Sequence, residues 1–131
     1  MSWIDANYIR RAAVTVDNSA GATGAQDITL TLPTKWDAFW GTGGVLSTGF
    51  DVRFTDSDGV TALVFNRNVW TYASQSAVFK IDGWTAVATK PSLVWMYWLY
   101  AAAADASAAV TITAERTGYI EMLAPSGAYR I

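Results

Sequence analysis

Hydrophobic and polar residues alternate along most of this chain. Val14 and Val16 flank Thr15, and the segment 27–32 alternates in the same way. A period of two is typical of strands that bury one face and expose the other. The same pattern, or a run of β-forming residues, marks further segments at 50–55, 60–65, 69–73, 77–81, 93–100, 110–114 and 119–123. We therefore predict an all-β fold of about nine short strands, which is typical of an antiparallel, jelly-roll-like β-sandwich.

Turn-forming residues separate the predicted strands. Asp56-Ser57-Asp58-Gly59 lies between two β-forming segments, and this arrangement predicts a hairpin. We expect further turns at Asp82-Gly83, Lys90-Pro91 and Thr117-Gly118, because glycine and proline favour turn conformations.

Two segments depart from the period of two. Trp36, Phe39 and Trp40 are spaced as one face of a helix, so one or two helical turns are expected there, ended by the glycines of 41–44. Ala101–Ala109 contains good helix formers, but we interpret it as a small-residue connection between two late strands.

Length and composition restrict the classes of protein. A chain of 131 residues fits one domain, with short arms expected at 1–7 and 124–131. The absence of Cys and His excludes thiol nucleophiles, disulfides, imidazole bases and most transition-metal sites, and a net charge of −2 gives little support for nucleic-acid binding. The apolar run at 93–104 is shorter than the ~20 residues of a membrane-spanning helix, and residues 1–11 lack the pattern of a secretory signal.

Carboxylate chemistry has weak candidates in this sequence. Asp56 and Asp58 precede a glycine as in a calcium-binding loop, but Phe54 and Phe65 stand where that loop needs oxygen ligands. A glycoside hydrolase would need two facing carboxylates, and the possible pairs are Asp56 with Asp58 and Glu115 with Glu121. Neither spacing is diagnostic. We expect a protein that is not an enzyme and that uses no cofactor.

The aromatic content is the most informative excess, with seven Trp, six Tyr and five Phe. Residues 94–100 are apolar at consecutive positions, so a strand there carries large side chains on both faces. The Ala-rich segment or the N-terminal arm can cover the second face, or it can contact another protein through Trp95, Tyr97, Trp98 and Tyr100. A third interpretation is a carbohydrate platform, for which the candidates near predicted loops are Trp36, Trp40, Trp70 and Trp84.

Several segments together resemble a known family. They are Tyr8-Ile9-Arg10-Arg11, the residues 14–19, 27–30, 63–70 and 77–81, the aromatic strand that ends at Tyr100, and above all Asp51-Val52-Arg53-Phe54-Thr55-Asp56-Ser57-Asp58-Gly59. In this order, over about residues 8–105, the chain resembles the bacterial and archaeal domain of unknown function 2341. The resemblance implies a β-sandwich of the kind found in larger surface or secreted proteins, often beside lectin-like sandwiches, with no assigned catalytic residues.

The chain departs from the family pattern in two places. Asn66-Arg67-Asn68 replaces an acidic position, and Tyr100-Ala101-Ala102-Ala103 replaces a Tyr-Gly-Asn turn. As a small stand-alone sandwich without Cys and rich in Ala, Thr and Gly, the chain is also similar to accessory virion proteins of tailed bacteriophages. That similarity implies synthesis in the host cytoplasm, location in the virion, and a structural role in a homo-oligomer or against capsid or tail proteins.

Overall fold

The computed structural model describes residues 4–17, 24–86, 92–110, 115–120 and 128–129. Of these residues, 49% lie in strands and 4% in helix, so the predicted all-β class is confirmed. The elements are β1 (Arg10–Val16), β2 (Gly24–Thr31), α1 (Asp37–Trp40), β3 (Arg53–Thr55), β4 (Val64–Thr71), β5 (Ser76–Ala86), β6 (Leu93–Trp98), β7 (Glu115–Ile120) and β8 (Ala128–Tyr129).

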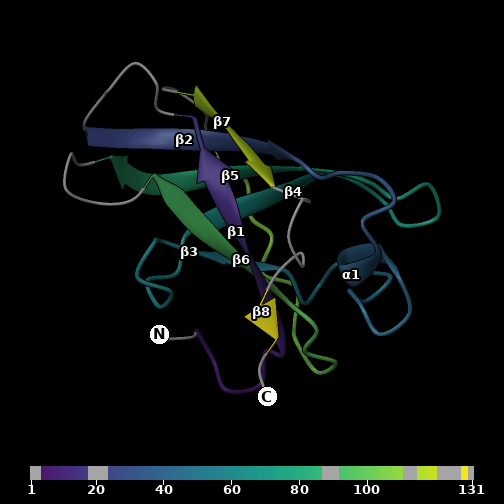
Figure 1. Ribbon diagram of the computed structural model, residues 1–131. Coiled ribbons are helices and arrows are strands. Elements are labelled where there is room, and N and C mark those ends of the chain that lie inside the picture. The colour runs from purple at the N-terminus through teal and green to yellow at the C-terminus, as the bar shows by residue number, and fades with distance from the viewer. Residues whose placement is uncertain (1–3, 18–23, 87–91, 111–114, 121–127, 130–131) are drawn as a thin grey trace.

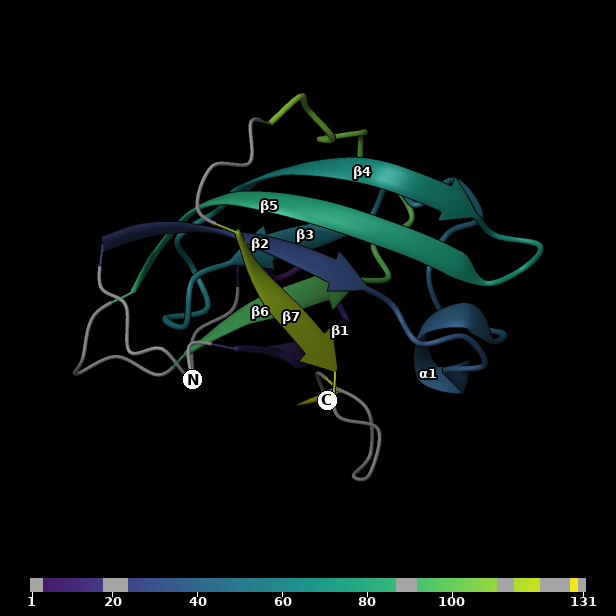
Figure 2. The same ribbon diagram turned by 90° about the horizontal axis from the view of Figure 1, so that it is seen from above.

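These strands belong to a single curled sheet (Figure 1). Their order is β3-β6-β1-β7-β2-β5-β4, and β8 pairs with the start of β1. All pairings are antiparallel except that of β2 with β7, which is parallel. The two end strands approach each other, because the Leu63 N–H donates to the Phe54 carbonyl over 3.0 Å and Thr55 forms a bridge with Ala62. The sheet is therefore close to a barrel, as its curvature in Figure 2 shows.

The predicted two-layer sandwich of nine strands is not confirmed. β1 pairs with β6 along one edge and with β7 and β8 along the other, so the strands on its two sides form one continuous sheet. Hydrophobic periodicity shows which face of a strand is buried, but it does not distinguish two packed sheets from one sheet that curls around the same core.

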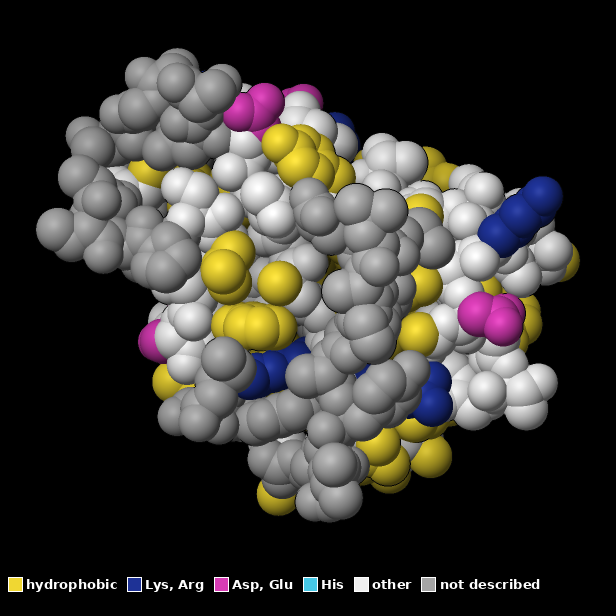
Figure 3. Space-filling view, viewed as in Figure 1, with side chains coloured by type: hydrophobic (Ala, Val, Ile, Leu, Met, Phe, Trp, Pro, Cys, Tyr) yellow, Lys and Arg dark blue, Asp and Glu magenta, His cyan; other side chains and the backbone are white. Residues whose placement is uncertain are grey.

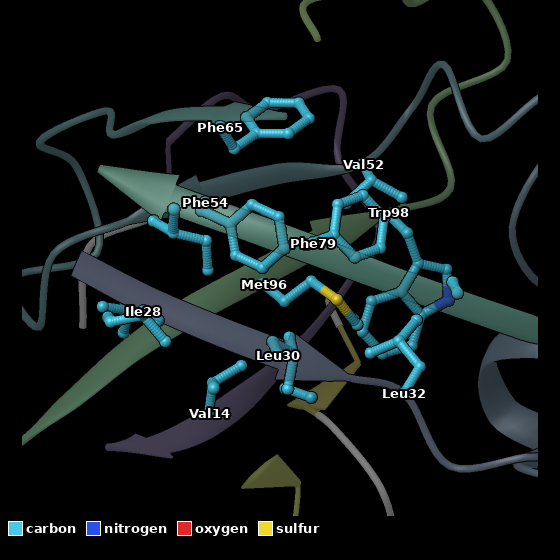
Figure 4. Packing of buried hydrophobic residues seen from close by; sticks show 14 of the residues in the cluster. Val14, Ile28, Leu30, Leu32, Val52, Phe54, Phe65, Phe79, Met96 and Trp98 are labelled. Atoms are coloured by element: carbon cyan, nitrogen blue, oxygen red, sulfur yellow. The ribbon is translucent and has the colours of Figure 1, made fainter. Parts of the chain in front are cut away.

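The interior of the curled sheet is filled by alternate residues of its strands (Figure 4). Val14, Ile28 and Phe79 are fully buried, and Met96 and Trp98 extend the same core towards α1. The predicted helical turn forms at α1, where it buries Phe39 and Trp40 against this core. Removal of these large side chains from water is the main favourable contribution to folding.

The predicted turn at Asp82-Gly83 is wrong. β5 continues through both residues, which oppose Asp27 where the pairing shifts between Gln26 and Ile28. In the resulting β-bulge Gly83 has a positive φ of 89°. A turn would require the same conformation, so the glycine does not distinguish a bulge from a turn. The chain instead turns after Thr71, where residues 72–75 join β4 to β5.

The predicted turn at Thr117-Gly118 is also wrong, because both residues lie inside β7. Gly118 faces the core, where a Cβ atom would lie 2.8 Å from Ile28 Cγ2. The glycine is therefore explained by close packing rather than by chain reversal. The predicted segments 60–65 and 69–73 contribute to one bulged strand, β4.

Other predictions can be placed as follows. Ala101–Ala109 forms a connection without helix, as expected. In the predicted C-terminal arm, Ala128 and Tyr129 pair with β1. The Lys90-Pro91 turn, residues 111–114 and residues 121–123 lie outside the described residues. In the part of the chain that the structure describes, no helix has the length and apolar character needed to cross a membrane.

Candidate functional site

The aromatic strand β6 has two faces with different surroundings. Val94, Met96 and Trp98 point into the core and are fully buried. The Trp98 indole N–H donates to the Ala38 carbonyl over 3.1 Å, so this ring also anchors α1. Trp98 is an interior residue, although the sequence made it a candidate for contact with another protein.

On the outer face, Tyr97 is also fully buried. Its hydroxyl donates to the Gly59 carbonyl over 2.7 Å and accepts from Nη1 of Arg11 over 3.0 Å. Tyr8 packs edge-on against it, with ring centroids 6.0 Å apart. The N-terminal segment and the turn at 56–59 thus cover this part of β6. The Ala-rich segment contacts the neighbouring strands, because the Ala104 carbonyl accepts from Nη2 of Arg53 in β3 and the Ala108 N–H donates to the Phe65 carbonyl of β4.

Trp95 and Tyr100 are the two interface candidates that reach the surface. The Arg11 guanidinium lies over the Trp95 ring at 4.1 Å from its centroid, and Tyr100 packs edge-on against Tyr8 at 5.3 Å. Figure 3 shows hydrophobic side chains over β1 and β6 with basic side chains beside them. We call Tyr8, Arg11, Trp95, Tyr97 and Tyr100 the outer aromatic cluster.

Asp51, at the edge of this cluster, is a fully buried carboxylate that the sequence did not single out as a site residue. It accepts the Leu99 N–H over 2.8 Å and the Leu46 N–H over 3.2 Å, and so ties the end of β6 to the loop before β3. Burial raises the pKa of Asp51, and these backbone N–H groups oppose the increase. Burial also raises the pKa of Tyr8 to about 12.

The carbohydrate candidates surround α1 or lie in the interior. Trp36, Trp40 and Trp84 are buried, and only Trp70 is partly exposed. The Trp70 indole N–H donates to the Ser47 carbonyl over 2.8 Å, and its ring lies 5.2 Å from that of Trp40. Tyr72, which the sequence did not single out, is 37% exposed beside Trp40. Tyr72 lies in the turn after β4, and composition alone does not show that this turn places it beside Trp40.

The weak metal candidates hold the hairpin turn in place. Asp58 Oδ1 accepts the N–H groups of Val60 and Thr61 over 2.9 Å, and Asp56 Oδ1 accepts that of Ser57 over 2.6 Å. Bonds of this kind are typical of Asp residues in turns. Among the described residues, no group of three acidic residues is arranged to hold a metal ion.

A different carboxylate pair forms at the bulge of β5. A hydrogen bond with Asp27 raises the pKa of Asp82, and burial and the charge of Asp27 act in the same direction. Of the pair Glu115 and Glu121, Glu115 is exposed and lies 3.8 Å from Lys80, whereas Glu121 lies outside the described residues. The Asp27–Asp82 pair depends on the pairing of β2 with β5, which the sequence does not specify.

The outer face of β4, β5 and β2 carries an uncharged row of side chains. Val69 pairs with Val78, and Val78 pairs with Thr31, so the three lie side by side across the strands. Val69 is 39% exposed, and Val64, near the start of the same strand, is 54% exposed. Val64 pairs with Asp82 and lies outside this row. We call Val69, Val78 and Thr31 the β-branched face.

Comparison with known proteins gave no match to a family model, a curated protein or a solved structure. The resemblance to the domain of unknown function 2341 and the similarity to accessory virion proteins therefore stay predictions.

Proposed function

We propose that this protein is a non-catalytic structural protein that binds other protein subunits through apolar and aromatic surface residues. The partner is a second copy of the chain, a capsid protein or a tail protein. The specific form of the proposal is an accessory virion protein of a tailed bacteriophage, either a capsid decoration protein or a small tail component. As a variant of the domain of unknown function 2341, it would carry the two layers of that sandwich as one curled sheet.

The β-branched face is the observation that best supports this proposal. An apolar side chain exposed on the outer face of a sheet is costly in water, and the cores of protein interfaces are depleted in charge. Val69, Val78 and Thr31 form such an uncharged row, while the ionic groups Lys80 and Asp82 lie further along the same face of β5. Burial of this row against another subunit would stabilise an assembly without any chemical step.

The hydrogen bonds and the ion pair made by the acidic residues also favour a structural role without a chemical step. Asp51 and Asp58 accept backbone N–H groups, and Asp105 forms a two-point ion pair with Arg67 at 2.9 and 3.1 Å. Arg67 and its partner tie the Ala-rich connection to β4. Carboxylates held in this way stabilise loops, and they are not placed as a facing acid and base.

The direct test compares two single substitutions with the unchanged protein. Val69→Lys places a charge on the β-branched face, whereas Val60→Lys places the same charge just after the turn at 56–59, on a valine that is 47% exposed against 39% for Val69. The mass in solution is measured by light scattering after size exclusion over a concentration series. We expect Val69→Lys to shift an oligomer towards the monomer and Val60→Lys to leave it unchanged. A protein that is monomeric at all concentrations, and whose binding to a separate capsid or tail lattice is unaffected by Val69→Lys, would contradict the proposal.

Carbohydrate binding is the second candidate function, and Tyr72 and Trp70 are the observation that favours it. They are neighbouring aromatic side chains with exposed surface at one end of the sheet, and each packs against Trp40. A sugar ring stacked there would change the tryptophan fluorescence. A saturable change that is lost in Tyr72→Ala would favour this function over the structural one.

A further inference from the structure

Arg116 of β7 points into the interior of the curled sheet. Its neighbour Glu115 points outward, because its carboxylate lies 3.8 Å from Lys80, whose ammonium donates to Thr29 on the outer face of β2. Gly118, two residues after Arg116, faces the core against Ile28 and Val14. Since side chains alternate along a strand, Arg116 lies on the core side with Gly118.

The side chain of Arg116 has no ionic or hydrogen-bonding partner in the part of the chain that the structure describes. Its Nε atom is buried, and no acceptor lies within hydrogen-bonding distance of it. A guanidinium that is partly removed from water normally has a carboxylate or several carbonyl partners, because an uncompensated charge in a protein interior is costly. The carboxylates of Glu115 and Asp27 lie on adjacent strands but on the opposite face of the sheet.

A second unsatisfied polar group lies at the same end of the interior. Gln26 is only 8% exposed, and its side-chain oxygen is buried without a hydrogen bond among the described residues. Gln26 pairs with Trp84 of β5. It precedes Ile28 by two positions on β2, so the two side chains lie on the same face. Ile28 in turn pairs with Arg116 of β7 in the parallel ladder. Figure 4 shows Ile28 at one end of the labelled core. Gln26 and Arg116 are therefore neighbours at the end of the sheet where β2 and β7 begin.

We propose that Arg116 and Gln26 form a binding site for a small oxyanion, a carboxylate or a phosphate, with the buried Trp84 ring as one wall. The guanidinium offers up to five N–H donors in a planar arrangement that matches both oxyanions, and the amide of Gln26 adds two more donors. The amide oxygen accepts a hydroxyl of a protonated phosphate or of a hydroxy acid. Arg116 is partly exposed, so it is accessible to an ion from solvent.

The test is a titration of the whole protein with potassium phosphate and, separately, with potassium acetate. Potassium chloride at the same ionic strength is the reference. The backbone and side-chain N–H signals of Arg116 and the indole N–H signal of Trp84 are followed by nuclear magnetic resonance. We expect a saturable change in these signals with at least one of the two oxyanions and no saturable change with chloride. The two titrations show whether the site prefers a phosphate or a carboxylate.

Two matched variants show whether Arg116 holds the ion. Arg116→Met keeps an unbranched apolar stem and removes the guanidinium with its charge and N–H donors, and we expect it to weaken binding by at least about tenfold. Lys80→Met removes one positive charge on the outer face of the same sheet, and we expect unchanged binding. The proposal fails if phosphate and acetate act like chloride on the unchanged protein, or if the two variants weaken binding equally. The unchanged protein is informative by itself, so the result does not depend on how Arg116→Met folds.

Discussion

The close approach at Gly118 leads to a specific prediction about stability. In Gly118→Ala, the new Cβ would lie 2.8 Å from Ile28 Cγ2 and 3.0 Å from Val14 Cγ1. Contacts this short force both neighbours to move within a packed interior, and overpacking of this kind costs about 1–3 kcal/mol. The loss of glycine flexibility in the unfolded chain offsets about 0.4–1 kcal/mol of that cost. We therefore expect a net destabilisation of about 1–2 kcal/mol.

Urea denaturation followed by tryptophan fluorescence measures this change. With a slope of about 2 kcal/mol per M, the midpoint should fall by roughly 0.5–1 M. Thr117→Ala changes the neighbouring exposed residue of β7 and is the matched control, with an effect within about 0.5 kcal/mol. Val14→Ala removes one of the two close contacts, so Gly118→Ala should cost less in that background than in the unchanged protein.

The reasoning would be refuted if Gly118→Ala were neutral or stabilising. That result is expected for a glycine in a strand with free space beside its Cα atom. It would mean that β7 does not lie against β2 in the parallel register that the structure shows.

Two further predictions concern the bulge and the aromatic strand. The pKa of Asp82 is raised above its ordinary value of 3.8, chiefly by the hydrogen bond with Asp27, so the folded protein binds this proton more tightly than the unfolded chain. Its stabilising contribution should therefore be lost as the pH rises from 3.8 through the raised pKa, and Asp82→Asn should weaken this pH dependence in urea denaturation measured at several pH values. Trp98→Ala should cost about 3–5 kcal/mol, because it empties a buried site and leaves the Ala38 carbonyl without its indole donor. Circular dichroism should then show loss of the fold at a lower temperature, whereas Trp95→Ala, at a partly exposed position, should cost less.

Local patterns predicted the elements better than their arrangement. The alternation at Val14 and Val16, the helical spacing at Trp36 and Trp40, and the hairpin turn after Thr55 all depend on neighbouring residues, and the structure has each of them. The single curled sheet depends instead on which strand pairs with β1, and that pairing joins segments far apart in the sequence. Gly83 and Gly118 show the same limit, because a glycine in a bulge or at a close contact has the local signature of a glycine in a turn.

The candidate sites were predictable only in part. The sequence predicts an aromatic strand with large side chains on both faces, and β6 is that strand. It does not show that Arg11, Tyr8 and the turn at 56–59 cover Tyr97. The proposed site at Arg116 was not visible, because its neighbour Gln26 lies on a distant segment and the parallel register brings the two together. From sequence alone a charged residue in a strand is expected to face solvent, and only the pairing of its strand shows whether it faces the interior.

The position of β1 at the centre of the sheet affects how this protein can fold. β1 is the first strand of the chain, yet its partners β6, β7 and β8 are all encoded in the last part of the sequence. During synthesis, the hydrogen-bonding edges of β1 stay unpaired until these partners leave the ribosome. A topology dominated by such long-range pairing folds slowly, because large loops must close before their contacts form. For much of its synthesis the nascent chain therefore exposes a hydrophobic strand with two open edges, which makes it a substrate for chaperones and a risk for aggregation.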